Sequence, residues 1–124
     1  MAYALHVKVP GLPKTPNAQN GGWQMRHGAV VKWKRKVISE IVLNRAGVPA
    51  EPLKLATLTL TRHSAVQPDY DNLVGSFKST IDALREVGIL ANDKTLNFTG
   101  GRPEYRWALG KRGKGCIEIE LEQA

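Results

Sequence analysis

The fold is decided by residues 69–88, which read DYDNLVGSFKSTIDALREVG. Apolar residues recur there at positions i, i+4, i+8 and i+11, the spacing of one face of a helix: Leu73, Phe77, Ile81 and Leu84. Gly88 follows the run, and glycine readily adopts the left-handed conformation that often ends a helix. The stretch therefore predicts an amphipathic helix with one buried face.

Outward from this helix, strand and helix patterns alternate along the chain. Alternating apolar residues predict strands at 3–9, 53–61 and 117–121. Apolar residues at helical spacing, ended by Gly47, predict a helix over about 29–46. Residues 95–109 read as extended, and the glycine-rich residues 110–115 read as a hairpin turn. The order β-α-β-α-β-β predicts an α/β (α+β) fold, a small mixed sheet with two helices packed on it.

Bulk composition limits the classes of protein that the chain can represent. A length of 124 residues predicts one domain, 1–124, without room for a second core. The net charge of +7 indicates an anionic partner such as nucleic acid. No apolar run is long enough to span a bilayer, so no membrane partner is expected. The single cysteine, Cys116, cannot form an internal disulfide and predicts a packed thiol in a reducing cytoplasm.

The aspartates of this basic chain are concentrated in one window that runs from Asp69 to Asp93. The pair Asp69 and Asp71 opens it, and carboxylates so close repel each other unless a cation lies between them. On a helical wheel Lys78 and Asp82 both fall within about 20° of Asp71. Lys78 would lean back toward the start of the helix. This arrangement predicts a metal site beside a lysine, which suits cleavage of a polyanion.

Ordinary structural roles compete with that interpretation. Asp71 is a suitable N-cap, and Pro68-Asp69 is common turn chemistry. Asp82 is four residues from Lys78, and we favour a simple ion pair between them. Asp93 lies in a typical turn composition. The histidines are expected to be solvated or packed, on a strand and in loops, rather than to act as a general base: His6, His27 and His63.

Basic residues outside this window predict contacts with the phosphates of DNA, which give affinity without base reading. One group leads into and follows the first predicted helix, on the face opposite Trp33 and Val37; the other lies near the C-terminal strands. The residues are Arg26, Lys32, Arg35, Lys36, Arg102, Arg106, Lys111, Arg112 and Lys114. Trp23, in a glycine-rich loop, is a further candidate for contact with a base or a partner.

The aspartate window resembles the signature of the RusA-type crossover junction endodeoxyribonucleases. The matching residues are Asp69-Tyr70-Asp71-Asn72-Leu73, Lys78, Ile81-Asp82-Ala83-Leu84, Gly88 and Asp93. An early segment, Pro13-Lys14-Thr15-Pro16-Asn17, resembles the loop that follows the first strand in that family. The core of the resemblance covers residues 67–94.

The resemblance implies a small homodimer that resolves four-way (Holliday) junctions in DNA recombination and repair. It implies magnesium as cofactor, with Mn²⁺ as a possible substitute. By motif position Asp69, Asp71 and Asp93 would be the catalytic, metal-binding carboxylates, and Lys78 the catalytic lysine.

Two departures from the family pattern concern this site. About three additional residues separate Asn72 from Asp82, which would move Lys78 roughly 4–5 Å along the helix relative to Asp71. Asn92 replaces the first acid of the usual pair, and we expect Asp93 to be the ligand. Two alternatives to the resolvase stay open: a non-catalytic basic DNA-binding protein, and a metal-dependent nuclease of broader branched-DNA specificity.

Overall fold

The protein was analysed as a computed structural model, which describes residues 2–14, 23–91 and 103–123, with only the backbone of 23–25. Three helices and four strands follow one another along these segments. They are β1 (Ala4–Pro10), α1 (Trp23–Leu43), β2 (Ala56–Ser64), α2 (Tyr70–Ser76), α3 (Lys78–Glu86), β3 (Glu104–Leu109) and β4 (Cys116–Gln123). Among the described residues, no helix is long and apolar enough to cross a membrane.

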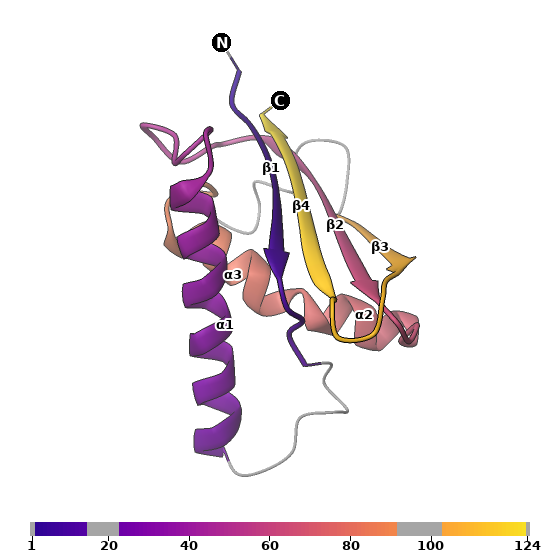
Figure 1. Cartoon of the computed structure of the whole chain (residues 1–124). Helices are drawn as coiled ribbons and strands as arrows, with labels where there is room; N and C mark the ends of the chain where they lie inside the picture. Colours follow the sequence, from indigo (N-terminus) through magenta and orange to yellow (C-terminus); the bar gives the residue numbers. More distant parts are fainter. Residues whose placement is uncertain (1, 15–22, 92–102, 124) are drawn as a thin grey trace.

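The four strands form one mixed sheet in the order β1-β4-β2-β3 (Figure 1). Strand β4 pairs antiparallel with β1 and β2, whereas β2 pairs parallel with β3. The predicted mixed sheet with helices packed on it is confirmed. The hairpin predicted at 110–115 is wrong, because β3 and β4 lie on opposite sides of β2 and the segment between them crosses the end of that strand.

Strand alternation places one face of the sheet in the hydrophobic core. On β1 and β4 every second residue is buried, and the same core includes one stripe of α1 and the inner side of α2 and α3. The largest fully buried side chains include Phe77, Leu5, Ile41, Leu60, Leu84, Ile117 and Ile119. The other face carries the polar residues of the strands, as the alternation of glutamates after Cys116 predicted.

A buried polar contact and a surface ion pair join α1 to α3. Trp33 is a core residue, as its spacing predicted, and its Nε1 donates to Thr80 Oγ1 at 2.9 Å. Lys34 Nζ lies 2.7 Å from Glu86 Oε1 at the surface. Because an indole N–H buried without an acceptor is costly, the Thr80 hydroxyl fixes where α3 lies against α1.

The helix predicted from residues 69–88 is interrupted at Phe77, which separates α2 from α3. Its amide donates to the carbonyl of Val74, three residues back, so the last turn of α2 is tightened. The buried ring stacks on Tyr105 of β3, with 5.6 Å between ring centroids. Gly88, with φ of 95°, ends α3 as predicted: its N–H donates to Arg85 O, and Ile89 N–H donates to Leu84 O.

Other element boundaries differ from the sequence prediction by several residues. Helix α1 begins at Trp23 rather than near residue 29, so Trp23 starts a helix and His27 lies in α1, not in loops. Strand β2 extends to Ser64 because polar residues continue it: the buried Arg62 donates to Pro13 O at 2.8 Å, and Ser64 Oγ accepts from Trp107 Nε1.

Two glycines give a matched test of the strand crossing. A Cβ at Gly110 would lie 2.9 Å from the His63 carbonyl carbon, whereas one at Gly28 in α1 would meet nothing within 4 Å. We expect Gly110→Ala to lower the free energy of unfolding by about 1–3 kcal/mol through overpacking. Gly28→Ala should raise it by about 0.5–1 kcal/mol, because alanine favours a helix. Urea unfolding would measure both, and equal effects would contradict the crossing geometry.

Candidate active site and nucleic-acid surface

Asp69 and Asp71 lie on either side of the start of α2, after the loop that follows β2. Asp69 occupies the N-cap position with extended backbone (φ −58°, ψ 154°), and its carbonyl accepts from Leu73 N–H at 2.8 Å. Its side chain makes no capping hydrogen bond. Asp71 lies in the first turn of the helix, so the N-cap role that competed for it is wrong. Both carboxylates are exposed and are not used in capping.

The donor set at this junction fits a hard divalent cation. Asp69 and Asp71 offer carboxylate oxygens in contact with solvent, the ligands that Mg²⁺ and Mn²⁺ prefer together with water. Only Tyr70 separates them in the chain. The third predicted ligand, Asp93, and the neighbouring Asn92 lie outside the described residues.

Lys78 is the first residue of α3 and is exposed. The interruption at Phe77 means that one straight wheel no longer relates Lys78 to Asp71 across both helices. Asp82, expected to pair with Lys78, instead accepts at Oδ1 from Arg85 Nη2 at 3.0 Å. The ion pair predicted for Asp82 therefore has a different partner, and its carboxylate belongs to the surface of α3.

Most of the predicted DNA-contacting residues are exposed basic side chains. Four lie on α1, and three lie in the segment that joins β3 to β4: Arg26, Lys32, Arg35, Lys36, Lys111, Arg112 and Lys114. Arg106 is exposed on β3 but already pairs with Glu104, at 2.8 Å. Arg102 lies outside the described residues, as does the side chain of Trp23.

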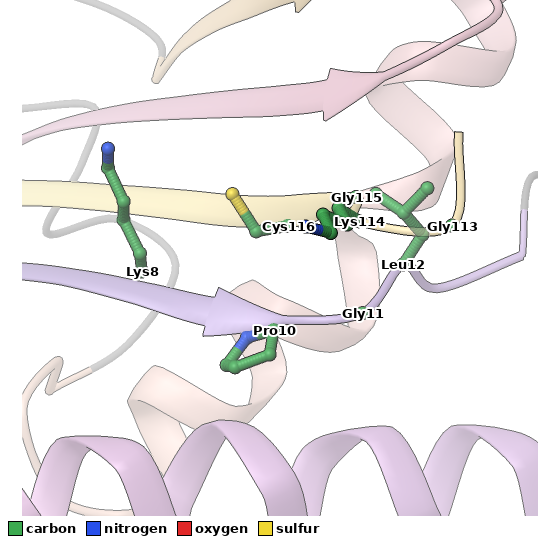
Figure 2. A pocket seen from close by; sticks show the side chains of 8 residues that line it. All are labelled: Lys8, Pro10, Gly11, Leu12, Gly113, Lys114, Gly115 and Cys116. Carbon is green, nitrogen blue, oxygen red and sulfur yellow. The ribbon is translucent and has the colours of Figure 1, made fainter. Parts of the chain in front are cut away.

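A hollow of about 550 Å³ lies beside the second of these basic groups, on the open face of the sheet (Figure 2). It lies where the end of β1 meets the start of β4, and Lys8 and Lys114 are among the residues that line it. Lys36 of α1 is not among the lining residues, although its Nζ would lie 2.9 Å from a Cβ on Gly11. Lys8 was missed from the sequence because it reads as one polar position of an alternating strand.

The open face of the sheet carries charges of both signs, since Lys8 is opposite Glu118. Four glutamates lie on this face, one on β3 and three on β4: Glu104, Glu118, Glu120 and Glu122. Two histidines predicted to be solvated or packed are hydrogen-bonded to Glu118, one from β1 and one from β2: His6 and His63. Hydrogen bonds from His6 and then His63 lower the pKa of the Glu118 carboxyl.

The chain was compared with known protein families and with curated proteins. No family model matches the chain. No curated protein matches it at a significant level. The resemblance to the RusA-type signature therefore rests on the motifs at residues 13–17 and 67–94 and stays a prediction.

Proposed function

We propose that this protein is a magnesium-dependent, structure-specific endodeoxyribonuclease that resolves four-way DNA junctions by paired nicks. The observation that carries the proposal is the state of Asp69 and Asp71. Only Tyr70 separates them in the chain. Both side chains are exposed, and neither caps α2. Since neither side chain caps the helix, both carboxylates keep their oxygens available as ligands for a metal ion.

The distribution of charge supports a DNA substrate approached from one side. Exposed lysines and arginines lie along α1 and in the β3–β4 connection, and Lys8 and Lys114 line the hollow. Phosphates would be attracted to both groups of basic residues. The proposed DNA path therefore follows α1 and the β3–β4 connection.

In this proposal each residue has a limited chemical role. Asp69 and Asp71 would hold the ion, with Asp93 as the expected third ligand. Magnesium, when bound, supplies Lewis acidity toward the scissile phosphate and an activated water. Lys78 would contribute a positive charge near the scissile phosphate or the leaving oxygen. Since a four-way junction has two-fold symmetry and paired nicks need two sites, the proposed active form is a homodimer.

The test is cleavage of a synthetic four-way junction by the purified chain. In millimolar magnesium we expect paired nicks in the junction and no cleavage of a duplex of matched sequence. With EDTA cleavage should stop while binding persists, because phosphate contacts do not need the ion. Mn²⁺ is expected to substitute for magnesium.

The same assay separates the alternatives. Binding that is equal with magnesium or EDTA, with no nicks at any protein concentration, would identify a non-catalytic basic DNA-binding protein. Flap and three-way substrates added to the panel test for broader specificity, since equal cleavage of these structures would contradict junction resolution as the main activity.

A further inference from the structure

Glu118 lies between two histidines at the centre of the open sheet face. Its Oε2 is 2.5 Å from His6 Nε2, and its Oε1 is 2.9 Å from His63 Nε2. Strands β1 and β2 flank β4, and each histidine is the diagonal neighbour of Glu118, since His6 is opposite Glu120 and His63 is opposite Cys116. Two flanking strands therefore bring side chains to one carboxylate of β4.

Glu120 completes a set of converging ligand atoms. One nitrogen of His6 and one oxygen each of Glu118 and Glu120 all lie within 4.8 Å of one another. The two carboxylates share one face of β4, two residues apart, and Lys8 of β1 is opposite Glu118. A divalent cation between the carboxylates and the His6 imidazole would give all three groups a common partner.

We propose that His6, Glu118 and Glu120 bind Zn²⁺ on the open face of the sheet. A mixed imidazole and carboxylate set suits zinc, whereas Mg²⁺ prefers oxygen ligands alone. Ligand atoms around tetrahedral zinc lie roughly 3.3–3.5 Å apart, given bonds of about 2.0–2.2 Å. Rotation of the exposed His6 and Glu120 side chains can bring the three ligand atoms from within 4.8 Å of one another to this separation. Three protein ligands leave the fourth position for water or another ligand.

His63 acts in this proposal as a positioning residue. The side chains of Glu118 and His63 are only 15% and 24% exposed, compared with 61% for His6. The contact of His63 with Oε1 holds the Glu118 carboxylate so that Oε2 faces His6 and Glu120. Outer partners of this kind orient metal ligands and raise affinity without touching the ion.

The zinc site does not depend on the proposed nuclease site. Its ligands come from β1 and β4, on the sheet face turned away from the helices, whereas Asp69 and Asp71 lie at the start of α2. Zinc held there would join β1 to β4 and so bind the folded chain only. We therefore expect it to raise the melting temperature.

The experiment is a titration of the full chain after chelator treatment and desalting. Zn²⁺ followed by calorimetry, and Co²⁺ followed by its visible absorbance, should each show one equivalent bound, undisturbed by millimolar Mg²⁺. His6→Ala and Glu120→Gln should each weaken binding by more than about a hundredfold, and His63→Ala by about tenfold to a hundredfold. Both ligand substitutions are at exposed positions, and circular dichroism would check that the variants fold.

Two matched variants make the outcome decisive. His27→Ala removes the histidine that lies on α1, and Asp71→Asn changes the loop–helix carboxylates; both should bind zinc as the parent chain does. The proposal is overturned if the parent chain binds no zinc below millimolar concentration, if His6→Ala and Glu120→Gln bind normally, or if Asp71→Asn is the variant that loses the ion.

Discussion

Asp71→Asn is expected to reduce junction cleavage by roughly a hundredfold or more, because it replaces a proposed metal ligand with a neutral amide. Binding of the junction should be kept or tightened, since one source of repulsion toward the DNA backbone is removed. Folding should change little, because Asp71 is exposed in the first turn of α2 and its charge there is worth only a few tenths of a kcal/mol or so. Single-turnover cleavage and gel-shift titration would measure the two effects separately.

Asp82→Asn is the matched control for that variant. It makes the same chemical change on α3, at a carboxylate that is paired with Arg85. We expect cleavage to stay within about twofold of the parent chain, because an exposed pair of this kind is worth little. An equal loss of cleavage in both variants would show that negative charge in this region matters, and not a metal ligand at Asp71. Loss of helical circular dichroism in Asp71→Asn would show a structural role for Asp71.

Phe77→Ala is expected to have the largest effect on stability, a loss of about 3–5 kcal/mol. The ring is fully buried, stacks on Tyr105, and lies at the single residue between α2 and α3. Truncation would leave a cavity at the point where both helices meet the sheet. The free energy of unfolding of a domain of this size is about 5–15 kcal/mol, so much of the stability would be lost. Urea unfolding should show a lower midpoint with an unchanged slope.

Leu43→Ala is the control for the loss of apolar volume. Leu43 ends α1 and is 80% exposed, so its truncation should change the free energy of unfolding by less than about 0.5 kcal/mol. Phe77→Leu should lower the free energy of unfolding by an amount between those of Leu43→Ala and Phe77→Ala. It keeps most of the side-chain volume but removes the stacking on Tyr105, which is worth about 0.5–1.5 kcal/mol. A Phe77→Ala variant as stable as Leu43→Ala would contradict the packing described for this ring.

The sequence predicted the elements that are set by local pattern. The spacing of Leu73, Phe77 and Leu84 located the second helical region, and the alternation after Cys116 located β4. The interruption at Phe77 was not predicted, because the apolar spacing continues across it; it follows Gly75-Ser76, where the Ser76 hydroxyl donates to Leu73 O. The end of β2 was placed too early since Arg62 is buried through a partner in another segment, Pro13.

Features that depend on strand pairing could not be predicted from local pattern. A glycine-rich segment between two strands favours a hairpin, and only the insertion of β2 between β3 and β4 excludes it. The convergence of His6 and His63 on Glu118 has the same origin, since distant strands become neighbours of β4. By contrast, the exposure of Asp69 and Asp71 followed from their place before and within the first turn of a short helix.

The position of β4 in the sheet has a consequence for the speed of folding. Leu5 is opposite Leu121, so the β1–β4 ladder forms only when the first and last strands meet. Closing a loop of nearly the whole chain costs entropy before any contact compensates for it. A topology dominated by such distant pairs folds slowly for its size. Until β4 arrives, the apolar residues of β1 and β2 stay without their central partner, and that interval is when the chain is most prone to aggregate.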